Sequence, residues 1–94
     1  MEFKIPKSLS IFGKTIKVIQ PWKVDKEDSR GDWWYTKGII KVKRSLPIEE
    51  KQVVFLHELT HAILDSLEYN ELSHDEAFVE TFSKALHQAL ITSE

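Results

Sequence analysis

Residues 53–64 read VVFLHELTHAIL and lie at the centre of a segment that runs from about Pro47 to Leu67. Apolar side chains recur along it every three or four residues, which predicts an amphipathic helix with one face in the core. The same segment carries His57, Glu58 and His61 in its middle. Titratable groups among apolar neighbours are costly unless they are paired or bind something. We therefore expect this helix to carry both part of the core and the functional site.

The residues before this helix alternate between apolar and polar side chains, a pattern typical of strands. Residues 9–19 place Ile16 and Val18 between lysines, and Gly13 marks a turn or bulge before the strand proper. Residues 33–35 and 39–43 flank a predicted tight turn at residues 36–38. The polar stretch 23–32 reads as a loop. We expect three short strands in a small, mainly antiparallel sheet.

The residues after the motif predict a second helix from about His74 to Ile91. Ser73 is a good helix N-cap, and Glu76 three residues later completes a capping box. The apolar stripe that we expect to face the core is made of Phe78, Phe82, Ala85, Leu86, Ala89 and Leu90. The sequence thus predicts an α+β fold in which a three-stranded, mainly antiparallel sheet packs on two helices, as one domain over residues 1–94.

The composition excludes several classes of protein. The 94 residues are 41% hydrophobic and 30% charged, which is typical of a globular domain. The absence of cysteine excludes disulfides, thiolate metal sites and a cysteine nucleophile. The start of the chain lacks the apolar region of a signal peptide, and no apolar run has the length of a membrane span. We expect a cytoplasmic protein without a membrane partner.

Charge is divided unevenly between the two halves of the chain. Residues 1–47 carry a net charge of +6 and residues 48–94 carry −8. Such asymmetry can mark a nucleic-acid-binding half, so a nucleic-acid-binding module is one alternative function. No basic cluster is longer than the run from Lys41 to Arg44. We favour a basic sheet that lies against acidic helices, and we do not expect nucleic acid as a partner.

His57 and His61 are four residues apart, so on a helix their rings project from one face about one turn apart. Two imidazoles at this spacing can reach a single tetrahedral zinc ion. Glu58 lies beside that ion, where its carboxylate can take a proton from zinc-activated water. This is the H-E-x-x-H pattern, whose mechanics are those of a zinc metallopeptidase that hydrolyses peptide bonds.

Catalytic zinc requires a third protein ligand and one open position. The candidates downstream of the motif are His74, Glu76 and Glu80. Glu76 and Glu80 are four residues apart and share a helix face, so one can bind the ion while the other orients a ligand histidine. The residues alone leave this choice open.

The stretch from His57 to Ala62 resembles the active-site helix of thermolysin-type peptidases, the gluzincins. The later segment Glu76-Ala77-Phe78-Val79-Glu80 is similar to their E-x-x-x-D element. This resemblance implies that Glu76 is the third ligand and that Glu80 supports a ligand histidine. The chain departs from the pattern by having Glu at the second place and only fifteen residues from His61 to Glu76, which leaves Glu80 as the alternative ligand.

Most of the chain also resembles the small HExxH proteins of phages, prophages and mobile elements that are related to the ImmA/IrrE-like zincins. The resemblance implies a short sheet, the motif helix and then a glutamate-bearing helix. It further implies that an edge strand beside the motif helix pairs with the substrate backbone, and we assign that role to residues 38–43. With little chain left for substrate walls, we expect cleavage of a specific protein substrate. The alternative is a zinc-stabilised domain without turnover.

Several other residues could contribute to a site. Tyr35, Tyr69 and His74 are the candidates for holding the oxyanion, and the sequence does not choose among them. Alternation predicts that Trp33 and Tyr35 share one face of a strand and that the intervening residue lies on the other. We expect His87, on the second helix, to be an ordinary and partly exposed residue.

Overall fold

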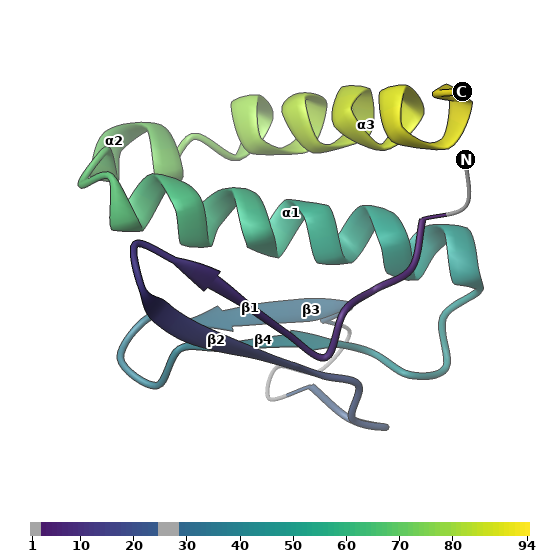
Figure 1. The fold of residues 1–94 in the computed structure, drawn as a ribbon, viewed down its shortest axis with the longest axis horizontal. Helices are drawn as coiled ribbons and strands as arrows, with labels where there is room; N and C mark the ends of the chain where they lie inside the picture. Colours follow the sequence, from purple (N-terminus) through teal and green to yellow (C-terminus); the bar gives the residue numbers. More distant parts are fainter. Residues whose placement is uncertain (1–2, 25–28) are drawn as a thin grey trace.

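The computed structural model describes residues 3–24 and 29–94, and its chain path is shown in Figure 1. Four strands are followed by three helices, so the expected α+β class is confirmed. The strands are β1 (Ser8–Ile11), β2 (Lys14–Ile19), β3 (Gly31–Trp34) and β4 (Ile39–Val42). The helices are α1 (Ile48–Ser66), α2 (Asn70–Ser73) and α3 (Glu76–Thr92). None of the helices in these two ranges combines the length and hydropathy needed to cross a membrane.

The four strands form one mixed sheet in the order β1-β2-β4-β3. β2 runs parallel to β4, whereas the β1–β2 and β3–β4 pairs are antiparallel. The expectation of three mainly antiparallel strands was therefore wrong in number and in one pairing. The strand β1 was missed because Phe12 and Gly13, at φ 50° and 80°, fold residues 8–19 back on themselves as a hairpin. Positive φ at both central residues is the geometry of a type I′ turn.

The hairpin predicted around residues 36–38 is confirmed, with β3 and β4 on its two sides. Its place in the sheet differs from the expectation. β4 pairs with β2 on one side and with β3 on the other, so residues 39–42 form an interior strand. An interior strand has no free edge for a substrate backbone, and the role assigned to residues 38–43 was wrong. The strands at the ends of the sheet are β1 and β3.

The helix α1 is the middle layer of the molecule. The sheet lies against one side of α1, and α3 runs along the other side in the opposite direction (Figure 1). Two fully buried strand residues, Ile40 and Val42, meet Phe55 and Leu56 of α1 in the core. The expectation that the sheet packs on two helices holds for α1 only, because α3 packs mainly against α1 and α2.

The buried face of α3 differs from the predicted stripe by about one residue. Val79, Ser83 and His87 are the buried residues of this helix, whereas Phe82 is 45% exposed and stacks on Phe78 with ring centroids 5.6 Å apart. The distance between two packed helices depends on the side chains at their contact, and here Val79, Ser83 and His87 take that place instead of the phenylalanines. The predicted stripe is therefore confirmed at Leu86 and Leu90, which pack against the core, and wrong at the exposed residues Phe82, Ala85 and Ala89.

The helix ends also differ from the prediction. Asp75 caps α3, and its carboxylate Oδ1 accepts a hydrogen bond from the backbone N–H of Phe78 at 3.1 Å. The predicted capping box at Ser73 is absent, since Ser73 ends α2 and is buried. At the end of α1, Glu68 adopts a φ of 63° and reverses the chain. The N–H of Tyr69 then bonds to the carbonyl of Leu64, which closes a Schellman motif.

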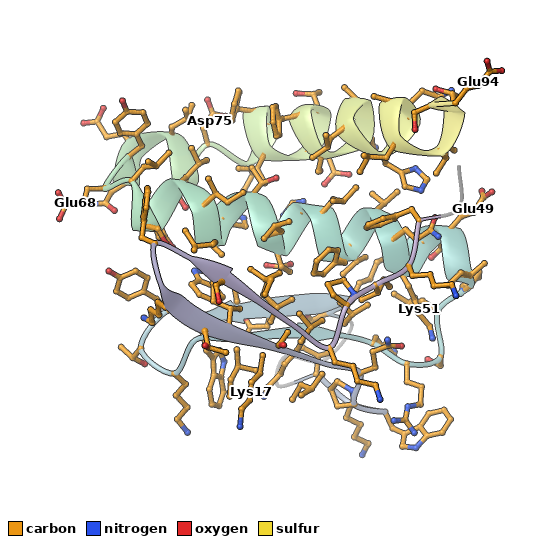
Figure 2. The ribbon with its side chains drawn as sticks, viewed as in Figure 1. Lys17, Glu49, Lys51, Glu68, Asp75 and Glu94 are labelled. Carbon is orange, nitrogen blue, oxygen red and sulfur yellow. The ribbon has the colours of Figure 1, made fainter. Side chains whose placement is uncertain are left out.

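Charge follows the layers as the sequence indicates. Lys17 projects from the face of the sheet that is turned away from the helices, whereas Glu68, Asp75 and Glu94 lie in the helical layers (Figure 2). Trp34 lies beneath the ammonium groups of Lys37 and Lys41, with Nζ 4.6 and 4.0 Å from its ring centroid. The outward face of the sheet is thus basic, and its aromatic residue is in contact with cations.

The three neighbouring aromatic residues are distributed as alternation predicts. Trp33 packs against the core, and its indole N–H donates to Asp65 Oδ2 at 2.9 Å. Tyr35 contacts Trp33 edge to face, with centroids 6.3 Å apart. Trp34 makes its ring contacts with the two lysines instead. Trp33 therefore anchors β3 to the C-terminal part of α1.

Candidate metal centre

The two histidines of the motif lie one turn apart on α1, with ring centroids 5.0 Å apart. Their side chains are only 18% and 14% exposed, because α2 and α3 cover this part of the helix. The neighbouring residues Thr60 and Ala62 are buried in the core. The spacing of four therefore does what the sequence predicted, in that it brings both rings to one face, next to the start of α3.

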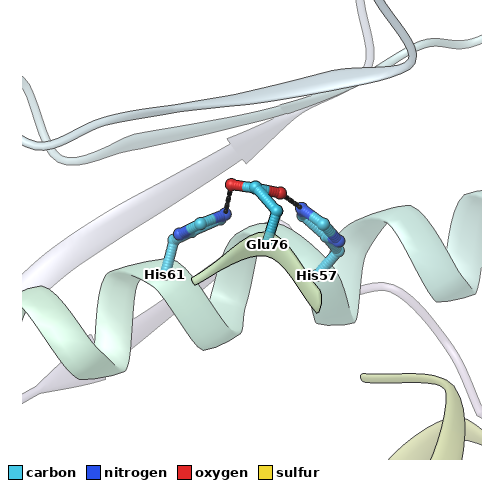
Figure 3. A group of neighbouring side chains, drawn as sticks. All are labelled: His57, His61 and Glu76. Carbon is cyan, nitrogen blue, oxygen red and sulfur yellow. Dashed lines mark ion pairs between the residues drawn. The ribbon is translucent and has the colours of Figure 1, made fainter. Parts of the chain in front are cut away.

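Glu76, the first residue of α3, completes the group (Figure 3). Its Oε2 lies 3.3 Å from His57 Nε2, and its Oε1 lies 3.2 Å from His61 Nε2. One ligand atom from each of the three residues falls within 4.8 Å of the others, so the group could hold a metal ion. Ligands about 2.0–2.1 Å from a tetrahedral ion lie roughly 3.3 Å from one another, and each Nε2 lies at about this distance from one of the two oxygens of Glu76.

The other nitrogen of each ring also has a partner. His57 Nδ1 lies 3.1 Å from Glu80 Oε2, and His61 Nδ1 lies 3.2 Å from Ser73 Oγ. An Nδ1–H that donates to either oxygen leaves the lone pair on Nε2, which is the atom that faces Glu76. Fixing the tautomer in this way is the usual role of the outer partners of metal-bound histidines. Glu80 contacts the side of the His57 ring that is turned away from Glu76.

This arrangement has an electrostatic consequence. Two imidazole lone pairs directed at one carboxylate repel it, unless a proton or a metal cation lies between them. Burial lowers the pKa of His61, although the negative charge of Glu76 opposes this shift. A lowered pKa favours the neutral ring, which is the form that binds a metal. Glu76 itself is 67% exposed, so the group is open to ions from solvent.

Glu58 sits one residue beyond His57, and its Oε2 lies close to Gly31 at the start of β3. Burial, together with the negative charges of Asp32 and Glu76, raises the pKa of Glu58 from 4.5 to about 8. A carboxyl group with a pKa near neutrality can both accept and return a proton. Its position and proton affinity fit the general base that the sequence predicted.

Gly31, at the start of β3, forms the wall opposite Glu58. A Cβ added at Gly31 would lie 2.5 Å from Val54 Cγ1, 2.8 Å from the carbonyl oxygen of Lys41 and 3.3 Å from Glu58 Oε2. No real Cβ approaches other atoms as closely as the first two distances. Glycine is therefore required here by space, since it lets the edge strand lie directly against the motif helix.

A groove of about 770 Å³ runs along α1 from this wall. His57, Glu58 and Glu80 line the end that is next to the metal-binding group. Gly31 and its two preceding residues line the side formed by β3, and α3 forms the opposite side. The candidate base and one candidate ligand thus open into a single cavity large enough for part of a peptide.

The remaining candidates lie elsewhere. The described residues that form the metal-binding group do not include His74, and the groove is not lined by Tyr35, Tyr69 or His74. His87 was expected to be an ordinary, partly exposed residue, and this expectation was wrong: His87 is only 8% exposed and lines the groove. The apolar stripe predicted for this helix did not indicate that His87 is buried. A helix register read from Val79 and Ser83 would have placed it inward.

Ser73 is the other contributor that the sequence did not reveal. A Ser-x-x-Glu pattern predicted a helix cap at Ser73, but its hydroxyl group contacts His61 instead.

Comparisons with protein-family models, with curated proteins and with solved structures found no match to this chain. Function must therefore be argued from the residues and their geometry.

Proposed function

We propose that the protein is a zinc-dependent metallopeptidase that hydrolyses a peptide bond in a specific protein substrate. His57, His61 and Glu76 hold the zinc ion, and Glu58 is the general base. The observation that carries this proposal is that the candidate base and the candidate metal ligands meet at one cavity. Glu58 and His57 line the same groove, and the group of His57, His61 and Glu76 lies at its end.

The donor set supports zinc in particular. Two imidazole nitrogens and one carboxylate oxygen form a common catalytic zinc set, and the chain contains no thiolate that would close the site. A bound zinc ion supplies the Lewis acid that acidifies water and polarises the scissile carbonyl. Glu76 is the better third ligand than Glu80, because Glu80 contacts the Nδ1 of His57 while Glu76 faces the Nε2 of both histidines.

The role of Glu58 is proton transfer. Its carboxylate takes one proton from water as the water oxygen attacks the carbonyl carbon, and it then gives that proton to the nitrogen of the leaving amine. The carbon–nitrogen bond breaks to give an amine and a carboxylic acid, and the acid then releases the second proton of the water to become a carboxylate. The partly buried position of Glu58 in the groove wall keeps it close to the reacting bond and away from bulk water.

The edge strand that could hold the substrate backbone is β3. It ends the sheet in the observed strand order, and Gly31 lines the groove. A peptide laid beside β3 would add a strand to the sheet and would pass over the motif helix. β3 and α3 offer little surface for binding a peptide. We therefore propose that the substrate is a specific protein that makes further contacts outside the groove.

Metal analysis tests the site. Elemental analysis of the purified protein should find about one zinc per chain, and His57→Ala and Glu76→Ala should each remove it. Glu80→Ala should retain the ion with weaker affinity, since it removes only the support of His57. Wild-type protein that contains no metal, and takes up none when zinc is added, would contradict the proposal. Metal loss in Glu80→Ala with retention in Glu76→Ala would exchange the roles of the two glutamates.

Turnover needs a separate test, because a zinc-stabilised domain would give the same metal content. Wild-type protein and Glu58→Gln, both loaded with zinc, should be added to cell extract and the new protein N-termini identified by mass spectrometry. Glu58→Gln keeps the shape of the side chain and removes the base, so it should retain zinc and lose the cleavage products. Identical N-termini in both samples would leave only the structural role for the metal.

A further inference from the structure

The groove continues beyond the metal-binding group to the first turn of α1, and this distal part has no role in the proposed chemistry. Val53, His87 and Ile91 line it together with Glu49 and Glu50. From His57 to Glu50 the helix advances by about 10 Å. A long side chain that leaves a peptide backbone at the motif would extend along this part of the groove.

His87 is the unusual member of this set, because it is buried yet uses only one of its ring nitrogens. Its Nε2 lies 2.8 Å from Gln52 Oε1, and Gln52 Nε2 donates to the carbonyl oxygen of Phe3 at 2.7 Å. A carbonyl can only accept, so the amide of Gln52 must present its oxygen to His87. Nε2 of His87 therefore carries the proton, and in the neutral ring Nδ1 carries the lone pair.

The lone pair on Nδ1 is not fully enclosed by protein. Among the described residues no hydrogen bond is formed by His87 Nδ1, although every fully buried side-chain nitrogen and oxygen has a partner. Nδ1 must then reach accessible space, and the cavity that His87 lines is the groove. A histidine 92% buried thus presents an acceptor to whatever occupies the cavity.

The neighbouring groups match the same kind of occupant. Glu49 and Glu50 add two exposed carboxylates, which are acceptors only when ionised. Val53 and Ile91 add apolar surface between these acceptors and the motif. The cation nearest the other end, Lys84, is already paired with Glu80 at 3.2 Å. Arg30 is the other cation of the described lining, and its charge opposes a positive occupant.

We propose that the distal groove binds the side chain of a lysine or arginine of the substrate, close to the bond that is cleaved. The methylene stem lies against Val53 and Ile91, as long basic side chains do on apolar surfaces. The charged head donates to His87 Nδ1 and to the carboxylates of Glu49 and Glu50. This inference rests on the proposed peptidase function, since it names the substrate class for the same site.

Binding of a small basic probe tests the inference without any need for cleavage. Nα-acetyl-argininamide should be titrated into zinc-loaded, ¹⁵N-labelled protein, with Nα-acetyl-citrullinamide as the neutral control of nearly equal shape. The basic probe should shift the amide signals of Val53, His87 and Ile91, with a dissociation constant at least about threefold lower than that of the control. Equal binding of the two probes, or shifts confined to other parts of the chain, would overturn the inference.

Three variants assign the contacts. Glu49→Gln with Glu50→Gln should weaken the basic probe by about two- to fivefold for each removed charge, and leave the citrulline probe unchanged. Arg30→Gln should act in the opposite direction and strengthen binding of the basic probe. His87→Gln keeps an N–H near the position of Nε2 for Gln52, but its amide oxygen does not occupy the position of Nδ1. It should therefore weaken binding of the basic probe and leave the melting temperature of the protein unchanged. Unchanged affinity in all three variants would contradict the assignment.

The outcome is separable from that of the proposed function. A zinc-loaded protein that yields products dependent on Glu58 but shows no preference for the basic probe would refute the inference alone. A protein that binds the basic probe in the groove but has no metal would refute the peptidase proposal and leave the groove as a basic-peptide site.

Discussion

The hydroxyl oxygen of Ser73 lies 3.2 Å from Nδ1 of His61, although twelve residues separate the two in the chain. The short helix α2 makes this contact possible, because it places Ser73 under the C-terminal half of α1. One side of the His61 ring is thereby held by α2 while the other faces Glu76 of α3. The connection between the two long helices thus contributes a residue to the candidate metal centre.

Loss of this hydroxyl should weaken metal binding without unfolding the protein. Ser73→Ala removes the acceptor that orients His61, and substitution of such outer partners typically lowers metal affinity by about 10- to 100-fold. Competition with a chromogenic zinc chelator gives the affinity. Ser66→Ala is the matched control, since Ser66 Oγ bonds only to the carbonyl of Ala62 within α1. Equal affinities for Ser73→Ala and Ser66→Ala would show that the contact does not orient the ligand.

The raised pKa of Glu58 predicts a pH-dependent stability in the metal-free protein. Its pKa is about 8 in the folded chain against 4.5 as the ordinary value, so the folded state holds this proton more tightly. The contribution to stability is complete below about pH 4.5 and is lost as the pH rises to about 8, by up to about 1.4 kcal/mol per pH unit. Urea unfolding in the presence of a chelator, from pH 5 to pH 8, measures this loss.

Glu58→Gln is the control for that experiment, because its side chain has no proton to lose. The lowered pKa of His61 acts in the opposite sense, since it costs stability as the pH falls below 6.5. Both proteins share the His61 effect, so the difference between their curves isolates Glu58. Parallel curves for the two proteins would show that Glu58 titrates normally.

The contact between β3 and α1 should not tolerate a side chain at residue 31. Gly31→Ala should destabilise the protein by about 1–3 kcal/mol, because the new methyl group would overlap Val54 Cγ1 and the carbonyl of Lys41. A double-mutant cycle with Val54→Ala should recover part of the loss, since it removes one of the two overlaps. Additive effects in chemical denaturation would mean that the strand and helix do not approach this closely.

The first hairpin offers a stabilising substitution. Phe12 is 79% exposed and holds a φ of 50°, which is unfavourable for an aromatic residue. Phe12→Asn would create the Asn-Gly pair that type I′ turns prefer, and we expect a gain of about 0.5–1 kcal/mol in unfolding free energy. Phe12→Ala removes the ring without supplying this preference and should gain less. A larger gain in Phe12→Ala would assign the effect to the exposed ring.

Local patterns in the sequence predicted the elements but not their arrangement. The bounds of α1 and the β3–β4 hairpin followed from periodicity and turn residues, which act over a few positions. The parallel pairing of β2 with β4 could not be predicted, because alternation defines which face is buried and not which strand is adjacent. The relative positions of the motif residues could be predicted from their spacing alone, because all of them lie on one helix.

Contributions that depend on packing between elements were harder to predict. The inward position of His87 depends on which face of α3 packs on α1, and the Phe78–Phe82 pair indicated a different face. Ser73 fitted a capping rule as well as it fits its actual role. The sequence could not distinguish Glu76 from Glu80, because both are glutamates on one helix face. They differ in the nitrogen of the His57 ring that each contacts.

The layered order of the helices has a thermodynamic consequence. Both histidines belong to α1, which is fixed to the sheet, whereas Glu76 belongs to α3, which packs on α1 and α2. An ion held by all three therefore links attachment of the C-terminal helix to the concentration of free metal. Each tenfold rise in that concentration above the dissociation constant adds about 1.4 kcal/mol to the attached state. Resistance of residues 76–92 to a protease would then serve as a gauge of metal supply.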